Sequence, residues 1–458
     1  MSELQEATTP LSAWLQRIGD RSATLGIIGL GYVGLPLTLL FSEERFRVIG
    51  FDIDPVKVET LNGGGSYIHR IEPNHIQAAQ SAGFRATTDF AEVAHVDAVL
   101  ICVPTPLYAD HTPDMSYVVA TIEAIAPHLR RGQLVVLEST TYPGTTEEIV
   151  VETINRHGGA RGVRVLRADD ADTDSLEGVM VAFSSEREDP GNVTVPRRDI
   201  PKVIGGVEER ATAAASAMYG AIFHRTVPLS SPAAAEMTKL LENIYRCVNI
   251  ALINELKQLC IHMGLDIWEI VGAAATKPFG FQAFYPGPGV GGHCIPVDPF
   301  YLSWKAKQFG FATRFIELAG EVNEAMPEYV VRTAESALGR EGVALQGAKV
   351  LVLGVAYKRD VDDLRESPSL KVIDLLRKGG AEVRYNDPFF PTVGRGRKYD
   401  LRMHSASLAA EELAAYDCVV IVTDHSSYDY AQIVESSRLV VDSRNATKGL
   451  VSSKIVRC

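Results

Sequence analysis

The sequence predicts an α/β protein with two Rossmann-like, doubly wound parallel-sheet domains joined by a long central helix. Short apolar runs alternate with helical patterns both before and after one long, uninterrupted helical pattern. Buried strands that alternate with helices are typical of parallel βαβ units. A chain of 458 residues is also too long for one ordinary core. We therefore expect an N-terminal domain at residues 1–225, a central helical region at 226–325 and a C-terminal domain at 326–458.

The N-terminal domain is expected to begin as a strand, a helix and a second strand. The helix is the segment GLPLTLLFSEE, and the strands of this domain are TLGIIGL, RVIGFDID, DAVLICVPTP and QLVVLESTT. An acidic, polar run at residues 167–178 follows these segments. We expect this run to form a solvated surface loop.

The central helix is predicted at residues 231–264, where Ala, Leu, Glu and Lys dominate. Pro232 suits the first helical turn, and Gly264 marks the end. Apolar residues recur all round this helix, as they do in a helix that is buried on several sides. We therefore expect it to connect the two α/β domains and to form a homodimer interface.

The C-terminal domain repeats the alternation of strands and helices after about residue 325. Its expected strands are AKVLVLGVAY, AEVRYNDP, DCVVIVTDH and RLVVDSRN, and its expected helix is SPSLKVIDLLRKGG. This second pattern again favours a parallel sheet.

Charge and composition exclude several classes of protein. A net charge of −12 argues against broad binding to nucleic acid, although local N–H groups and arginines still allow a small anionic ligand. The six cysteines contain no CxxC pair and no zinc-site spacing, so we expect neither a disulfide framework nor a metal. Neither a signal peptide nor an apolar run of about 18 residues is present, so we expect a cytoplasmic protein without a membrane partner.

A dinucleotide fingerprint lies directly after the first expected strand. In GIIGLGYVGLPL, Gly29, Gly31 and Gly34 follow the order GxGxxG and open a helix. These glycines permit a tight turn and a close approach of a pyrophosphate to the helix N-terminus. Asp52 ends the next strand, 18 residues after Gly34, near the offset of a ribose-binding acid. A carboxylate there would repel the 2′-phosphate of NADP, so we expect NAD as the cofactor.

One cysteine stands on a loop that is poor in helix formers. The segment PGPGVGGHCIPVDPFYL, residues 286–302, places Cys294 after His293 and four residues before Asp298. A cysteine that only fills a core usually lies on an apolar face of a helix or strand. We therefore expect the thiol of Cys294 to face a ligand.

Together these segments resemble the nucleotide-sugar dehydrogenases, the family of UDP-glucose and UDP-N-acetylhexosamine 6-dehydrogenases. The resemblance rests on GLGYVGLPL, ESTTYPGTT, KLLENIYRCVNIALINEL, PGPGVGGHCIPVDPFYL and GVAYKRDVDDLRESPSL, and it covers nearly the whole chain. It implies oxidation of a primary alcohol to a carboxylate by two NAD⁺, through an aldehyde and a cysteine thioester. A thiol is needed because the second hydride must leave from a tetrahedral carbon, which a thiohemiacetal provides.

The resemblance also implies catalytic roles for individual residues. Cys294 is the expected nucleophile, and Asp298 positions and activates water. Lys239 stabilises a developing oxyanion and Asn243 holds the bound oxygen; they are spaced i and i+4, so one helix face carries both. Thr140 carries an active-site water, and Glu186 serves as general acid or base.

Binding residues follow from the same resemblance. To the cofactor we assign Gly29, Gly31, Tyr32, Val33, Gly34, Asp52, Lys57, Pro104, Thr105, Ser139, Thr140 and Arg365. To the UDP-sugar we assign Glu186, Lys239, Asn243, Phe284, Tyr285, Gly289, Lys358 and Arg444. The planar guanidinium groups of Arg365 and Arg444 suit a diphosphate. We expect Gly291 and Gly292 to let the cysteine loop approach the sugar.

Two departures from the family pattern bear on the substrate. Ser185 stands in FSSERED where the family has proline. Pro190 stands where the glucose enzymes have a second glutamate, and a proline cannot transfer protons. His293 we interpret as a specificity or packing residue rather than as the base. These features favour the acetamido-sugar branch.

The sequence therefore predicts an NAD-dependent UDP-N-acetylglucosamine 6-dehydrogenase that supplies a uronic acid for a surface polysaccharide. UDP-glucose and the manno and galacto acetamido epimers remain alternative substrates. Two other classes share the fold: a silent sugar-nucleotide-binding regulator, and a dehydrogenase that transfers a single hydride. The first would lack the reactive residues and the second would not need Cys294.

Overall fold

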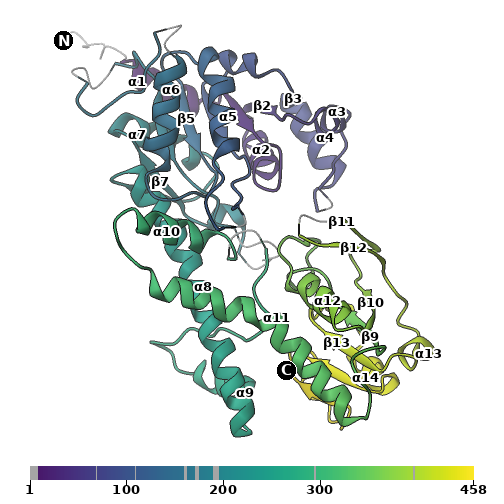
Figure 1. The fold of residues 1–458 in the computed structure, drawn as a ribbon. Helices are drawn as coiled ribbons and strands as arrows, with labels where there is room; N and C mark the ends of the chain where they lie inside the picture. Colours follow the sequence, from purple (N-terminus) through teal and green to yellow (C-terminus); the bar gives the residue numbers. More distant parts are fainter. Residues whose placement is uncertain are drawn as a thin grey trace, which may run out of the picture. The chain divides into compact units, whose positions relative to one another are not determined.

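The computed structural model describes residues 9–68, 70–108, 110–158, 162–170, 175–188, 195–292, 295–395 and 398–458. The chain divides into two compact units (Figure 1). The first unit runs to Leu241 and includes Lys307–Phe309, and the second comprises Glu242–Ala306 and Gly310–Cys458.

The first unit is built on one sheet, in which eight strands of the described chain follow the order β3-β2-β1-β4-β5-β6-β7-β8. The strands are β1 (Thr24–Ile28), β2 (Arg47–Phe51), β3 (Arg85–Thr87), β4 (Ala98–Ile101), β5 (Leu134–Leu137), β6 (Met180–Phe183), β7 (Lys202–Gly206) and β8 (Thr226–Leu229). Neighbouring strands pair in parallel, except that β6 and β7 are antiparallel. The four strands and the helix predicted in this part of the chain are confirmed. Strand order reverses between β1 and β4, which is where such sheets bind ligands.

Helices cover both faces of this sheet. One face packs against α1 (Pro10–Gly19), α2 (Gly34–Glu43), α4 (Pro73–Ser81) and α7 (Glu209–Gly220). The other packs against η1 (Phe90–His95), α5 (Ser116–Ile125), the π-helical η3 (Thr146–Val151) and α6 (Glu152–His157). The remaining short helices are α3 (Pro55–Asn62), η2 (Ala126–His128) and η5 (Arg197–Asp199). Leu100 and Ile101 are adjacent in β4 but join opposite cores, because successive side chains of a strand alternate.

The predicted central helix is α8 (Pro232–Met263), which starts in the first unit and continues into the second. The other helices in this region are α9 (Ile267–Ala274), α10 (Asp298–Lys307) and α11 (Arg314–Arg340). We expected α8 to be buried on several sides, and this was wrong for the single chain. Leu252, Leu259 and Met263 are 51%, 53% and 62% exposed.

The second unit contains a five-stranded parallel sheet among its described residues, in the order β10-β9-β13-β14-β15. Its strands are β9 (Lys349–Leu353), β10 (Glu382–Asn386), β13 (Cys418–Ile421), β14 (Val440–Asp442) and β15 (Ile455–Arg457), and a separate hairpin contains β11 (Thr392–Arg395) and β12 (Asp400–His404). Helices α11 and α12 (Pro368–Lys378) pack on one face, and α13 (Ala410–Leu413) and α14 (Tyr430–Ser436) pack on the other. This sheet also reverses its strand order beside its first strand, between β9 and β13. The strands and the helix predicted here are confirmed.

The acidic run at 167–178 forms a loop in its described parts, residues 167–170 and 175–178. Asp170 is not simply solvated, because its carboxylate lies 2.6 Å from Arg164 and 3.6 Å from Arg210. Across the described ranges, no helix is both long and apolar enough to cross a membrane.

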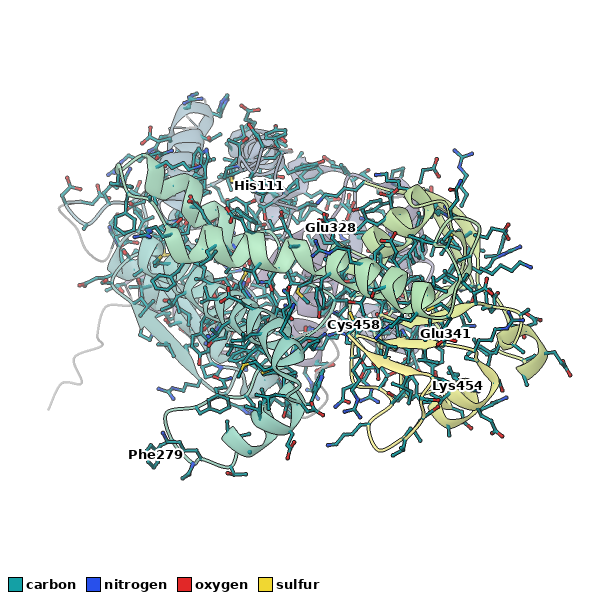
Figure 2. The ribbon with its side chains drawn as sticks, turned by 60° about the horizontal axis from the view of Figure 1, so that its bottom comes forward. His111, Phe279, Glu328, Glu341, Lys454 and Cys458 are labelled. Atoms are coloured by element: carbon teal, nitrogen blue, oxygen red, sulfur yellow. The ribbon has the colours of Figure 1, made fainter. Side chains whose placement is uncertain are left out.

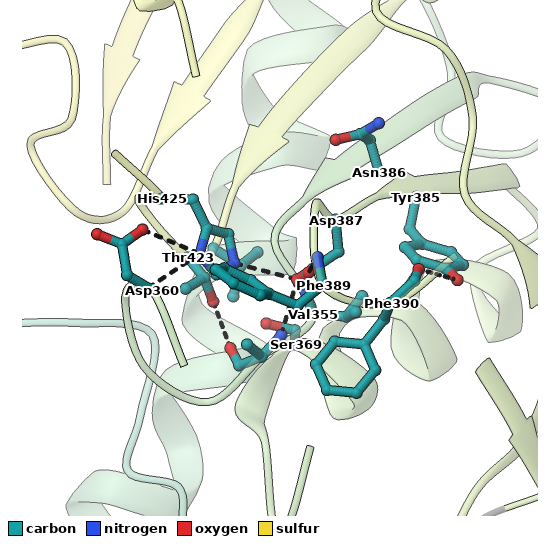
Figure 3. A network of polar contacts seen from close by, with 12 residues as sticks. Val355, Asp360, Ser369, Tyr385, Asn386, Asp387, Phe389, Phe390, Thr423 and His425 are labelled. Atoms are coloured by element: carbon teal, nitrogen blue, oxygen red, sulfur yellow. Dashed lines mark hydrogen bonds and ion pairs between the residues drawn. The ribbon is translucent and has the colours of Figure 1, made fainter. Parts of the chain in front are cut away.

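A buried aspartate ties together the carboxyl ends of three strands in the second unit (Figure 3). Asp387 follows β10 and accepts backbone N–H bonds from Val355 (2.7 Å) and Ala356 (3.0 Å), which follow β9. It also accepts one from Phe389 (2.8 Å). His425, which follows β13, lies 3.1 Å from the same carboxylate through Nε2. One carboxylate thus holds the loops that follow β9, β10 and β13.

His425 also holds the loop after β9, through its other ring nitrogen. Nδ1 accepts the backbone N–H of Asp360 at 3.0 Å, so Nε2 carries the proton and donates it to Asp387. Burial raises the pKa of Asp387, but the hydrogen bonds from His425 and the backbone outweigh burial and leave that pKa below its usual value. Asp387 therefore stabilises the fold while it is ionised, and acid removes that contribution.

Replacing Asp387 with alanine should destabilise the second unit by about 3–5 kcal/mol, because it leaves several buried N–H groups without an acceptor. Amide hydrogen exchange of β9, β10 and β13 should speed up accordingly. Asp400→Ala serves as a control, since the ion pair of Asp400 with Arg402 is exposed, and we expect a change within about 0.5 kcal/mol. Unchanged protection in the Asp387 variant would contradict this account.

Candidate active site

The fingerprint glycines form the turn between β1 and α2. Gly29 has a φ of +88°, and a Cβ atom there would lie 2.6 Å from the carbonyl oxygen of Cys102. A Cβ atom on Gly34 would lie 2.1 Å from the carbonyl oxygen of Gly29. A Cβ on Gly31, in contrast, would meet no described atom within 4 Å. The outer glycines are thus needed for the turn itself, while Gly31 leaves open space beside the helix N-terminus.

This open space fits the pyrophosphate of a dinucleotide. Within the described chain no side chain caps the N-terminus of α2, where a helix favours an anion. Tyr32 and Val33 belong to the same turn, and the ring of Tyr32 lies 5.7 Å from the guanidinium carbon of Arg70. The residues present therefore fit a bound NAD.

Asp52 follows β2 at the edge of the same turn and is buried. Its carboxylate accepts the backbone N–H groups of Leu30 and Asp54, each at 3.0 Å, and lies 3.2 Å from the ammonium group of Lys57. The structure thus brings Asp52 and Lys57 together beside the glycine turn. Contact with the ribose stays a prediction.

Two neighbouring loops carry the residues assigned to the nicotinamide half. Pro104 and Thr105 follow β4, and Ser139 and Thr140 follow β5. The hydroxyl of Thr105 donates to the carbonyl oxygen of Thr140 at 2.8 Å, and the hydroxyl of Ser139 donates to that of Val103 at 2.7 Å. The structure therefore holds both loops together at the carboxyl edge of the sheet.

Glu236, near the start of α8, anchors the loop that carries Thr140. Its carboxylate accepts the N–H of Gly144 at 2.6 Å, and the N–H and hydroxyl of Thr146 at 2.9 and 2.7 Å. Burial raises the pKa of Glu236 to about 7, against the effect of these hydrogen bonds. Lys239 lies one turn further along α8 and is buried, so Glu236 links the helix of Lys239 to the loop of Thr140.

The second unit brings two predicted catalytic residues into direct contact. Asn243 on α8 donates its amide to a carboxylate oxygen of Asp298 at 2.6 Å, and both residues are buried. Asp298 is the first residue of α10. Cys294 and His293 lie outside the described residues, as does Pro190.

The glycines before Cys294 pack against protein. A Cβ atom on Gly291 would lie 2.7 Å from the Cβ atom of Tyr357. A Cβ atom on Gly292, whose φ is +82°, would lie 3.0 Å from the ring of Tyr357. The N–H of Gly292 donates to the carbonyl oxygen of Arg365 at 2.9 Å. We expected these glycines to make room for the sugar. In the structure these two positions contact Tyr357 and the 365–368 segment, and the approach of the loop to the sugar stays a prediction.

The residues assigned to the uridine and diphosphate lie in the second unit. Phe284 packs edge-on against Tyr245 at 5.7 Å, and Tyr285 stacks on Trp268 at 5.5 Å. Arg444 lies over Gly287, where a Cβ would be 2.7 Å from its guanidinium nitrogen.

Gly289 has a φ of +124°, and Lys358 follows β9. Arg365, which we assigned to the NAD phosphates, holds Asp363 with its guanidinium group at 2.7 Å. These contacts fix the side chains within the second unit. The ligands assigned to these residues stay predictions.

Sequence reasoning missed several charged residues that the structure buries around this site. Glu138 and Lys202 form a buried ion pair beside Ser185, and Glu236 caps the loop of Thr140. Thr141, adjacent to Thr140, is fully buried, and its hydroxyl has no hydrogen-bond partner in the described chain. In the sequence, such a residue is seen only as a charge at the end of an apolar run. That pattern is also typical of an exposed loop, so by itself it does not predict a buried charge.

The site defines an NAD-dependent dehydrogenase, and comparison with known proteins gives its family. Three models of the UDP-glucose/GDP-mannose dehydrogenase family match: the NAD binding domain at residues 23–223, the central domain at 233–325 and the UDP binding domain at 351–449. The chain therefore belongs to this family of nucleotide-sugar dehydrogenases, and the prediction of NAD as cofactor is confirmed.

Named relatives cover almost the full chain. A UDP-N-acetyl-D-mannosamine dehydrogenase from Salmonella typhi is 37% identical over 88% of this chain and 94% of its own length. An NDP-N-acetyl-D-galactosaminuronic acid dehydrogenase from Ralstonia nicotianae is 34% identical over 94% of this chain and 97% of its own. The solved UDP-D-ManNAc dehydrogenase from Pyrococcus horikoshii has a TM-score of 0.82 at 31% identity, over 95% of this chain and 98% of its own.

The raised pKa of Glu236 predicts a pH-dependent stability. The folded pKa of about 7 lies above the ordinary value of 4.5, so the folded state holds the proton more tightly. The free energy of unfolding should therefore fall by about 3 kcal/mol as pH rises from about 4.5 through 7. Glu236→Gln should remove this component.

The measurement is denaturant unfolding of both proteins between pH 5 and 8. The stability difference between wild type and Glu236→Gln should narrow or reverse as pH rises. The control Glu59→Gln replaces an exposed glutamate on α3, and its difference from wild type should stay flat. A constant difference for Glu236→Gln would show that burial does not control this carboxyl.

Proposed function

We propose that this protein oxidises the C6 hydroxyl of a UDP-N-acetylhexosamine to a carboxylate, transferring four electrons to two NAD⁺. The observation that carries the proposal is the buried contact between Asn243 and Asp298, which follows Cys294 by four residues. A buried amide and carboxylate beside a loop cysteine suit the formation and hydrolysis of a covalent intermediate.

The reaction begins with oxidation of the alcohol to an aldehyde. The Cys294 thiolate adds to this aldehyde, and the product is a thiohemiacetal. A second oxidation gives a thioester, and water then releases the carboxylate and the thiol. NAD held at the glycine turn and beside Asp52 would supply the hydride acceptor for each oxidation, while the protein's own residues would bind the sugar and move the protons.

The roles of the protein groups follow from their charge and burial. Lys239 is a buried cation on α8, suited to stabilise an alkoxide or an oxyanion at C6. Asn243 donates a hydrogen bond and is itself oriented by Asp298. Glu186 and Thr140 lie in the first unit, where they would move a proton and hold a water. Lys239 would also favour the thiolate form of Cys294.

The acetamido group is the best-supported part of the substrate assignment. Curated relatives across the full chain are named for UDP-N-acetyl-D-mannosamine and for an N-acetylgalactosaminuronic acid. These names favour the manno epimer over UDP-N-acetylglucosamine, which the sequence predicts. The gluco epimer stays a prediction, and the product would serve a surface polysaccharide made from cytoplasmic precursors.

A homodimer through α8 is supported by the apolar surface of the second unit. Leu252, Leu259 and Met263 line one side of α8 and are all more than half exposed. Phe311, Phe315 and Leu318 add exposed fractions of 66%, 78% and 54%. Phe279 points outward from the loop after α9 (Figure 2) and is 71% exposed. An apolar surface of this kind is typical of an interface between copies of a chain.

Stoichiometry tests the proposed reaction. With excess NAD⁺ near pH 8, wild type should form two NADH for each UDP-N-acetylhexosamine consumed. Cys294→Ser should lose multiple turnovers by at least about 100-fold, because the hydroxyl of serine stays protonated at this pH and is a far poorer nucleophile than a thiolate. The gluco, manno and galacto epimers and UDP-glucose are assayed side by side by NADH absorbance and product mass.

The control is Cys418→Ser, since Cys418 is a buried strand residue of the second unit, and it should keep the two-to-one ratio. One NADH per sugar from wild type would indicate a single hydride transfer. Full activity of Cys294→Ser would reject the covalent route, and a preference for UDP-glucose would reject the acetamido assignment alone.

The dimer is tested by light scattering at micromolar concentration. Leu252→Arg combined with Leu259→Arg should convert wild-type dimers to monomers, because it places two cations in the apolar interface. Val451→Arg is the matched control, since Val451 is an isolated and fully exposed apolar residue. A wild-type monomer would reject the proposal.

A further inference from the structure

A fully buried lysine, Lys202, binds the backbone of the residue that precedes Glu186. Lys202 begins β7, and its ammonium group is held by the carboxylate of Glu138 at 2.8 Å and the carbonyl oxygen of Ser185 at 3.1 Å. It also lies over the rings of Tyr219 and Phe223, 5.0 and 5.5 Å from their centroids. A buried lysine is stable only when its charge is compensated, and these four groups compensate it.

The partner carboxylate is held as firmly as the lysine. Glu138 follows β5 and accepts a hydrogen bond from the hydroxyl of Tyr219 on α7. Its backbone N–H donates to the carbonyl oxygen of Ile101 at the end of β4 at 2.9 Å. Burial raises the pKa of Glu138, and Lys202 and Tyr219 oppose that rise. The ion pair therefore joins the ends of β4 and β5, the start of β7 and helix α7.

Lys202 acts on Glu186 through both the backbone and charge. The carbonyl oxygen that it binds belongs to Ser185, the residue before Glu186. The Glu186 carboxylate accepts the N–H groups of Arg187 and Glu188, each at 2.9 Å, so it folds back over its own loop. Burial raises the pKa of Glu186, but Lys202, Arg197 and these N–H groups outweigh burial and leave the pKa below its usual value.

Other titratable groups face the same carboxyl group. Glu138, the thiol of Cys102 at the end of β4 and the phenol of Tyr219 on α7 all interact electrostatically with Glu186. Glu138 repels its negative charge, while Cys102 and Tyr219 are neutral because burial, above all, raises the pKa of each. Arg197 also pairs with Glu188 in the same loop. Lys202 is therefore the buried cation of this cluster.

We propose that Lys202 is a positioning residue for the reaction, which fixes the backbone at Ser185 and keeps Glu186 ionised as a base. This inference rests on the proposed function, because it assumes that Glu186 transfers a proton during turnover. An ionised Glu186 accepts a proton from the C6 hydroxyl or from water, and a protonated one does not. Lys202 thereby allows the base to work at neutral pH.

The test compares two variants of the Glu138–Lys202 ion pair, of which one removes only the negative charge and the other removes both charges. They should shift the acidic limb of the kcat profile in opposite directions. Glu138→Gln removes a negative charge and leaves the lysine, so the acidic limb of the kcat profile should move to lower pH. Glu138→Gln combined with Lys202→Met removes the cation as well, without leaving an unpaired buried charge. Its acidic limb should move to higher pH by about 1 unit. Lys202→Arg, made with Glu138 in place, keeps a cation at this position. Its acidic limb should therefore lie close to that of wild type.

The assay measures initial rates of NADH formation between pH 3.5 and 9 with saturating NAD⁺ and UDP-sugar, because the pKa of Glu186 lies below its usual value and the acidic limb falls in this range. NAD⁺ affinity and the thermal midpoint are measured for each variant, to show that it is folded and binds cofactor. Lys378→Met is the matched control, because its ammonium group is exposed and pairs only with Asp374 four residues before it in the described chain. It should leave the profile unchanged.

Opposite shifts of the two variants would support the positioning role, since a purely structural defect lowers kcat without moving the limb in opposite directions. Coincident profiles for wild type and both variants would overturn the inference while leaving the proposed function intact. A wild type that forms no NADH with any of the four UDP-sugars would overturn the proposed function and this inference with it.

Discussion

Within each sheet, the parallel strands end at the same edge, their carboxyl edge. The backbone N–H and C=O groups that follow this edge have no partners in the sheet. The loops that leave these edges carry most of the residues predicted to bind NAD, so their backbone must be held by other means. Buried carboxylates do this: Asp52 at the dinucleotide turn, Glu236 at the loop after β5, and Asp387 in the second unit. Each accepts at least two backbone N–H groups, which fixes a loop that has no regular structure of its own.

Burying a carboxylate is unfavourable unless hydrogen bonds or a cation compensate it, and Asp387, Glu236 and Glu138 use different solutions. Asp387 has hydrogen bonds from three backbone N–H groups and a contact with His425 of the loop after β13. Glu236 has hydrogen bonds but no lysine or arginine within salt-bridge distance in the described chain, and its pKa rises to about 7. Glu138 has Lys202, whose charge also reaches Glu186. The same structural problem thus produces a hydrogen-bonded network, a titrating group and a charged pair.

The cysteine loop shows how a sequence pattern can have a local cause. Gly291 and Gly292 lack side chains because Tyr357 and the 365–368 segment occupy the space beside them. The loop is therefore pressed against the second unit's own sheet edge, near the segment that carries Lys358. A rigid loop suits a nucleophile, because a bound geometry that is fixed in advance lowers the entropic barrier to attack.

The sequence by itself determined the βαβ pattern of both units, the bounds of α8 and the dinucleotide turn. These depend on apolar periodicity and on glycine spacing, which are local properties of the chain. The contact between Asn243 and Asp298 could be anticipated only through the family resemblance, because 55 residues separate them.

Only the tertiary structure decided which charged residues are buried and what they hold. Lys202 and Glu138 lie 64 residues apart, and Glu236 lies about 90 residues from the loop that it caps. In the sequence, each is an ordinary charge at the end of an apolar run. Folding brings them together because parallel strands place their ends side by side, and desolvation then gives these groups pKa values and partners that no local pattern encodes.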